Sequence, residues 1–152
     1  MYKKLFLISI TLWLVTAGIF VKFFITGQTS KSSDNRTAIH LTAGEKDIVL
    51  GEMRTVLSAV NQTIKALAKD DFKEASIAIK KAGAGMAVDI NPALMAKLPL
   101  EFKKFGLSMH DDFDNFSAEL DKGMTQKQAL EKMGQITNKC VTCHATYRLT
   151  NE

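Results

Sequence analysis

Apolar residues recur every three or four positions in four stretches of the chain, the spacing that places them on one face of an α-helix. The first stretch follows Thr42-Ala43-Gly44-Glu45, which has the form of a capping box, and predicts a helix to about Lys69. The second begins at Asp71 and is predicted to continue to about Met86, weakened by two glycines near its end. The very short connection between the two helices favours antiparallel neighbours.

The other two stretches lie in the second half of the chain. Asn91-Pro92 predicts a short helical turn, Pro99 opens the third helix, and Gly123 ends it. Thr125 and Gln128 form another capping box at the start of the fourth helix. No strand-like alternation, repeat or hairpin signal is found. The pattern therefore predicts an all-α fold, an antiparallel four-helix bundle.

An apolar stretch precedes these helices. Lys3 and Lys4 stand before an uncharged run from Leu5 to Val21, which residues 23–25 extend beyond Lys22. A run of about 20 apolar residues can cross a bilayer. A cleaved signal peptide has a shorter apolar core and a small-x-small cleavage site, so the long run and the lack of a clean Ala-x-Ala favour a retained transmembrane helix. The two leading lysines predict a cytoplasmic N-terminus and export of the rest.

Composition then divides the chain of 152 residues into three parts. Residues 1–26 are predicted to be the signal-anchor or transmembrane segment, and residues 27–42, rich in polar side chains, a flexible linker. Residues 43–152 are predicted to form the bundle. Three of the 20 basic residues lie in the apolar segment, which leaves 17 against 16 acidic ones. The net charge of +4 is thus no argument for nucleic acid as a partner.

The fourth helix carries Cys140-Val141-Thr142-Cys143-His144 on its apolar face. This C-x-x-C-H spacing is the attachment signature of a c-type haem. Two thiols three positions apart can each bond to one vinyl group of the macrocycle, and the next residue places an imidazole under the iron.

Two other interpretations of the cysteines are weaker. A redox dithiol is expected beside a βαβ pattern, and none is found. A closed zinc site needs four ligands, and the chain has no second cysteine pair, with His40 and His110 its only other histidines.

With these residues, the chain resembles the cytochromes c-prime and their low-spin relatives over about Glu45 to Leu149. The resemblance rests on the motif near the end of a fourth helix, on the following Ala145-Thr146-Tyr147-Arg148, and on Met53 in the first helix. It implies one covalent haem c per chain, held by Cys140 and Cys143 with His144 as proximal iron ligand. Arg148 is the candidate partner of a haem propionate.

In that family, the residue of the first helix that faces the iron decides the chemistry. A methionine there gives a low-spin iron suited to electron transfer, whereas an apolar residue leaves the iron five-coordinate and able to bind NO or CO. Met53 stands at the position that looks equivalent and is the candidate second metal ligand. Val49 replaces an arginine common in the family, so Leu50 or Leu57 could face the iron instead.

These observations predict a membrane-anchored periplasmic cytochrome that carries single electrons. The alternative is a haem protein that binds NO or CO for sensing or detoxification. No acid–base pair suggests an enzyme, and His110, the one candidate, is expected at the rim of the site. The expected partners are redox proteins of the respiratory chain and the bacterial inner membrane, crossed once, and a homodimer is possible.

Overall fold

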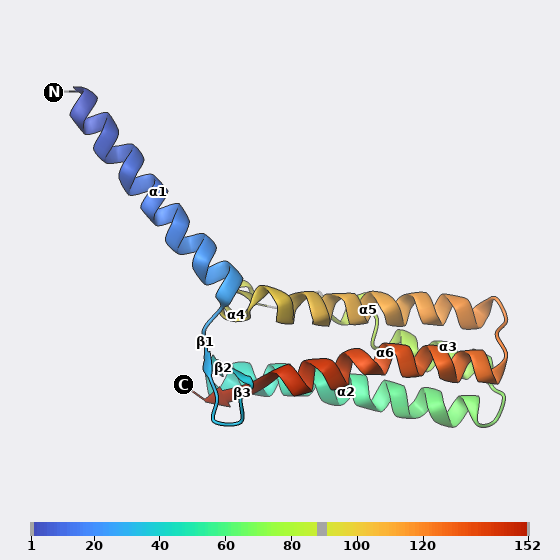
Figure 1. The fold of residues 1–152 in the computed structure, drawn as a ribbon. Coiled ribbons are helices and arrows are strands. Elements are labelled where there is room, and N and C mark those ends of the chain that lie inside the picture. Colours follow the sequence, from blue (N-terminus) through green and yellow to red (C-terminus); the bar gives the residue numbers. More distant parts are fainter. Residues whose placement is uncertain (1, 88–90, 152) are drawn as a thin grey trace.

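The computed structural model describes residues 2–87 and 91–151, most of which are helical (Figure 1). Its elements, in chain order, are α1 (Tyr2–Thr26), β1 (Thr29–Lys31), β2 (Thr37–Leu41), α2 (Ala43–Leu67), α3 (Phe72–Lys80), the 3-10 helix η1 (Ala84–Ala87), α4 (Pro92–Lys97), α5 (Leu100–Asp121), α6 (Gln126–Thr146) and β3 (Tyr147–Asn151). Helices α2, α5 and α6 run lengthwise through one elongated body, and α1 projects away from it (Figure 1). The mostly helical architecture with an apolar first helix agrees with the sequence prediction.

Local capping explains where the helices begin. The hydroxyl of Thr42 accepts a hydrogen bond from the N–H of Glu45, whose carboxylate accepts the N–H of Thr42 at 2.8 Å. Thr125 and Gln128 make the same reciprocal pair at the start of α6. Asp71, Asn91 and Pro99 occupy the N-cap positions of α3, α4 and α5. The predicted helix starts are confirmed.

Two apolar clusters hold the helices together. The larger one joins α2, α3, α5 and α6 and includes the fully buried Leu67, Ile79, Phe113 and Phe116. Burying a side chain of this size stabilises the fold by about 1.5–3 kcal/mol. The smaller cluster lies where α2 and α4 meet the sheet and consists of Ile39, Leu41, Val49, Leu94 and Leu98.

Helix α3 is shorter than expected. It ends at Lys80, and η1 follows, so the prediction of one helix to about Met86 is wrong. The N–H of Ala84 donates to the carboxylate of Asp114 in α5 at 2.9 Å instead of continuing a helix. Gly83, immediately before it, has the low helix propensity that permits this change.

The expectation of no strands is also wrong. The segment expected as a flexible linker contains β1 and β2, which pair antiparallel, and β2 pairs in parallel with β3. Ile39 and Leu41 in β2 are fully buried. The parallel partner of β2, β3, lies more than a hundred residues further along the chain, so no local pattern reveals that pairing.

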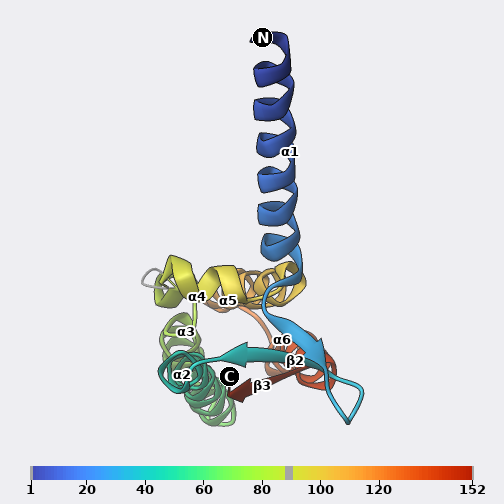
Figure 2. The same ribbon diagram turned by 90° about the vertical axis from the view of Figure 1, so that its left-hand side faces the viewer.

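Helix α1 meets the requirements of a membrane-spanning helix by length and composition. It has 25 residues, none of them buried, and contains an 18-residue stretch with a mean hydropathy of 2.1; a signal sequence meets the same criteria. Figure 2 shows that it rises from the side of the domain formed by α4 and α5, while α2 and β3 lie on the opposite side.

The end of α1 is fastened to the domain rather than loosely tethered. Gln28 donates its N–H to the carbonyl of Lys97 at 2.7 Å. The ammonium group of Lys103, a side chain only 7% exposed, donates to the carbonyl of Phe24 at 3.1 Å and lies 4.0 Å from the centre of its ring. Gly27 has a φ of +62°, and a Cβ there would lie 2.6 Å from the nitrogen of Pro99.

We therefore expect Gly27→Ala to destabilise the junction. The left-handed backbone and the clash with Pro99 together should lower the free energy of unfolding by about 2 kcal/mol or more. Gly44→Ala, at an open position in the first turn of α2, is the control and should leave stability unchanged or raise it by up to about 1 kcal/mol. Urea unfolding of the detergent-solubilised chain checks both; equal effects would contradict the tight junction.

Candidate functional site

Helix α6 carries the C-x-x-C-H motif in its last two turns. Met133 and Ile136 bury the earlier part of the helix in the larger core. Beyond them the helix emerges from that core: Cys140 and Cys143 are half-buried and His144 is exposed. The motif thus lies where α6 leaves the core and the chain turns into β3.

A cavity of about 320 Å³ lies between α2, the end of α6 and β3. It contains four of the five side chains that the sequence singles out. Cys143 and His144 line it from α6, Met53 from α2 and Arg148 from β3. The remaining lining residues are Arg36, Lys46, Leu50, Tyr147 and Leu149. The structure therefore brings the motif together with the candidate distal ligand, although 90 positions separate Met53 from Cys143.

Cys140, the fifth predicted residue, does not line this cavity. Its Sγ lies 3.5 Å from the Sδ of Met109 in α5. The two thiols of the motif therefore lie toward different neighbours of α6.

The same cavity distinguishes between the other α2 residues that could face the iron in place of Met53. Leu50 lines the cavity, one turn before Met53. Leu57 is 68% exposed and lies outside it, and Val49 is buried in the smaller core. Of these candidates, only Met53 and Leu50 remain as residues of α2 that could face a group bound there.

The environment of the thiols disfavours a redox dithiol. Burial raises the pKa of the Cys140 thiol. Burial, and then the negative charge of a Cys140 thiolate, raise the pKa of the Cys143 thiol to about 11. Dithiol oxidoreductases depend on a lowered thiol pKa, which supplies the reactive thiolate at neutral pH. Both cysteines here are protonated at that pH.

The donor set fits a haem better than a bare metal ion. Within residues 2–87 and 91–151, no group of three or more His, Cys, Asp or Glu side chains is placed to hold a metal ion. A closed zinc site requires such a group. A haem c requires only an imidazole and two thiols that bond to the macrocycle, and an optional soft ligand such as a thioether on the other side of the iron. His144, Cys143 and Met53 would supply this set from the cavity wall, and Cys140, on the same turn of α6, would supply the second thiol although it lies toward Met109.

His110 is not at the rim, as expected, but buried. It is 6% exposed, and its Nδ1 donates to the carbonyl of Ala82 at 2.6 Å. It does not line the cavity. Its position one residue beyond Met109 placed it beside the apolar stripe, and the irregular chain around Ala82 covers it. His110 therefore has a structural partner and no contact with the candidate site.

Three residues of the cavity wall have no counterpart among the sequence predictions: Arg36, Lys46 and Leu149. Arg36, in the turn between β1 and β2, lines the cavity next to His144. Tyr147 also lines it and packs edge-on against Phe102 of α5, with ring centres 5.4 Å apart. Tyr147 stands three residues after the motif, in the tail on which the resemblance rests, whereas Arg36 carries no local signal.

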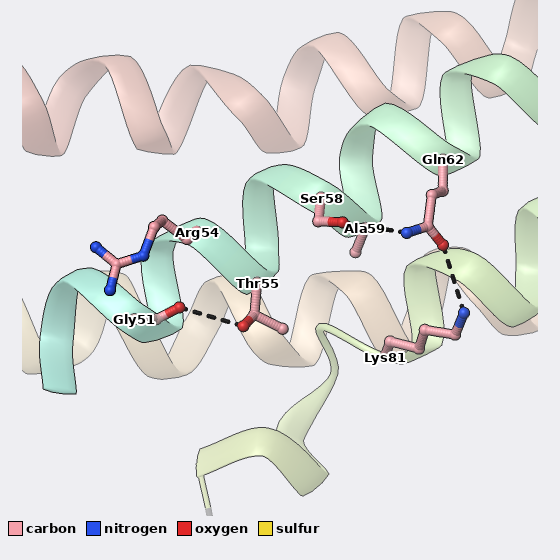
Figure 3. Close-up of a pocket in the computed structure, with 7 residues that line it drawn as sticks. All are labelled: Gly51, Arg54, Thr55, Ser58, Ala59, Gln62 and Lys81. Atoms are coloured by element: carbon pink, nitrogen blue, oxygen red, sulfur yellow. Dashed lines mark hydrogen bonds between the residues drawn. The ribbon is translucent and has the colours of Figure 1, made fainter.

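A second cavity, also of about 320 Å³, lies on the outer side of α2 near the end of α3 (Figure 3). Its polar side chains bond mainly to one another, as in the bond of 3.4 Å from Lys81 to Gln62. Arg54 lies at its other end and points away from Lys81 (Figure 3). No predicted site residue lies there, so Arg54 offers a control position remote from the motif.

A comparison of the chain with models of known protein families, with curated proteins and with solved structures finds no match. The site is therefore interpreted from its own residues.

The raised pKa of Cys143 predicts low reactivity in the folded, haem-free chain. Because the thiolate forms only near pH 11, alkylation by iodoacetamide at pH 8 should be slower than in the urea-unfolded chain, on the order of a hundredfold. The rate in the folded chain should rise as the pH approaches 11. Peptide mapping after timed alkylation measures it, and equal rates in the two states would refute the buried thiol.

Proposed function

We propose that the protein is a membrane-anchored, periplasmic c-type cytochrome with one haem, and that it carries single electrons. The observation that supports this most is the shared cavity: Cys143 and His144 of the motif line it together with Met53 of α2. A C-x-x-C-H motif alone identifies only an attachment site. A thioether from another helix in the same cavity adds the ligand expected of an electron carrier.

Each residue has a distinct role in this proposal. Cys140 and Cys143 would hold haem c through thioether bonds, and His144 would bind the iron. When bound, the haem supplies an iron that gains or loses one electron. Covalent attachment suits a site whose proximal histidine is exposed, since a haem held only by packing could leave an open cavity. Met53 would be the second iron ligand and would raise the reduction potential.

The basic part of the cavity wall suits the negatively charged edge of a haem. Arg148, Arg36 and Lys46 line it, and guanidinium groups form strong charge-assisted hydrogen bonds to carboxylates. Arg148 remains the candidate propionate partner, although it lies 3.5 Å from Asp34 and donates to Ser32 at 3.2 Å.

Leu50 favours a second candidate function. It lines the same cavity as Met53, and an apolar side chain over the iron would leave a coordination position vacant. The protein would then bind NO or CO for sensing or detoxification. The spin state of the iron distinguishes the two functions.

The junction at Gly27 and Lys103 supports α1 as a retained single-pass anchor in a bacterial inner membrane, because cleavage would remove the buried contact with Phe24. Lys3 and Lys4 would keep its start in the cytoplasm. We extend the proposal to the fold, with α2, α3, α5 and α6 as a four-helix bundle of the cytochrome c-prime type. The cavity lies among α2, α6 and β3, away from α1, so a redox partner of the respiratory chain would reach it from the aqueous side (Figure 2).

The reduced spectrum with and without CO tests this function in the exported, haem-loaded chain. The wild type should be low-spin and slow to bind CO. Met53→Ala should be high-spin and bind CO readily, because the thioether ligand is gone. Leu57→Ala, an exposed position of the same helix outside the cavity, should behave as the wild type.

Other outcomes contradict the proposal in different ways. A wild type that is already high-spin and takes up CO would replace the electron carrier by the gas-binding protein. A pyridine haemochrome spectrum without the c-type band would exclude both.

A further inference from the structure

The turn between β1 and β2 has a defined conformation beside the end of α6. Ser32 donates its N–H to the carbonyl of Arg36 at 2.9 Å, and Asn35 donates its own to the carbonyl of Ser32 at 3.2 Å. Asn35 adopts a φ of 67°, in the left-handed region that asparagine tolerates. The hydrogen bonds of the turn place Arg36 at the start of β2.

The guanidinium of Arg36 bonds to Asp34 on one side and to the end of α6 on the other. Its Nε and Nη2 donate to Oδ2 of Asp34 at 2.9 and 2.7 Å. Its Nη1 donates to the carbonyl of His144 at 3.2 Å and lies 3.5 Å from the carbonyl of Tyr147. The guanidinium thus joins the hairpin to a residue 108 positions away, the histidine of the motif.

This contact gives a hydrogen-bond partner to a backbone carbonyl that the end of α6 leaves unpaired within the helix. The carbonyls of the last helical turn have no partner within the helix, and the negative end of the helix dipole lies there. The N–H of Tyr147 already bonds to Cys143 as the chain turns into β3. Arg36 supplies both a donor and a positive charge to the next carbonyl, that of His144.

We propose that Arg36, oriented by Asp34, is a positioning residue for His144: it fixes the last turn of α6 and thereby the direction of the imidazole. The inference rests on the proposed function in one respect, that His144 binds haem iron. It assigns a role at the site to the segment expected as a linker, which also joins the membrane helix to the domain.

Asp34 suits this role because it contacts two arginines, Arg36 and Arg148. It accepts from Arg36 and lies 3.5 Å from the guanidinium of Arg148, which also lines the cavity. The Arg36 hydrogen bond holds the pKa of the Asp34 carboxyl well below its usual range. The carboxylate is therefore charged at neutral pH.

Hydrogen exchange provides a test that needs no haem. In the full chain, Arg36→Gln should speed exchange at the amides of Ala145, Thr146 and Tyr147 by about tenfold, because the end of α6 loses a charged partner. Asp34→Asn, which loosens Arg36 without removing it, should have a smaller effect in the same place. Arg54→Gln removes an arginine from the outer side of α2 and should leave these amides unchanged.

The loaded protein provides the second test. In the reduced Met53→Ala background, where the iron is expected to be five-coordinate and to show the iron–histidine stretching band in resonance Raman spectra, Arg36→Gln should shift that band while retaining covalent haem in the pyridine haemochrome assay. Arg36→Lys should recover part of the shift, because it keeps the charge without the fork of donors. A purely structural arginine would leave that band in place.

The two tests separate the possible failures. Unchanged exchange at the end of α6 overturns the proposal, even if the Raman band shifts, because Arg36 would then act on a haem propionate alone. Faster exchange with an unchanged band overturns the positioning of His144. A wild type without covalent haem removes the proposed function and, with it, this role of His144, while the exchange result still decides whether Arg36 holds α6.

Discussion

The pairing of β2 with β3 is the constraint on which the candidate site depends. It aligns Thr37–Leu41 with Tyr147–Asn151 and so joins the segment after α1 to the segment after the motif. The ladder satisfies the backbone groups of both strands, and Ile39 and Leu41 anchor it in the smaller core. Because β3 begins directly after α6, this pairing fixes the direction in which the motif leaves the helical core, and with it one wall of the cavity.

The same sheet connects the apolar helix α1 to the candidate site through the backbone. From Gly27 the chain passes into β1 with no free segment, and the β1–β2 turn places Arg36 against the last turn of α6. Lys103 closes the other side of the junction on the carbonyl of Phe24. In the proposed anchored electron carrier, such a connection would hold the haem domain in a fixed orientation, so that it would present the same face to its partner.

The sequence predicted the features that depend on local hydrogen bonds and helical spacing. Thr42 with Glu45 marks the start of α2, and Cys143 and His144 of the C-x-x-C-H motif line the cavity together with Met53. The features that it missed depend on contacts between distant residues. β2 is short, and its partner strand lies at the other end of the chain. His110 bonds to the carbonyl of Ala82, and Arg36 is recognised as part of the site only through its contact with His144. Neither contact leaves a pattern in the neighbouring sequence.

The central claim is that Cys140 and Cys143 hold one haem covalently. The intact mass of the chain, isolated from the membranes of a bacterium that matures c-type cytochromes, tests it most directly. The account predicts the polypeptide mass plus that of one haem, retained after unfolding and reduction, with the added mass on the peptide that contains both cysteines. A chain with the bare polypeptide mass and two thiols open to alkylation would contradict it.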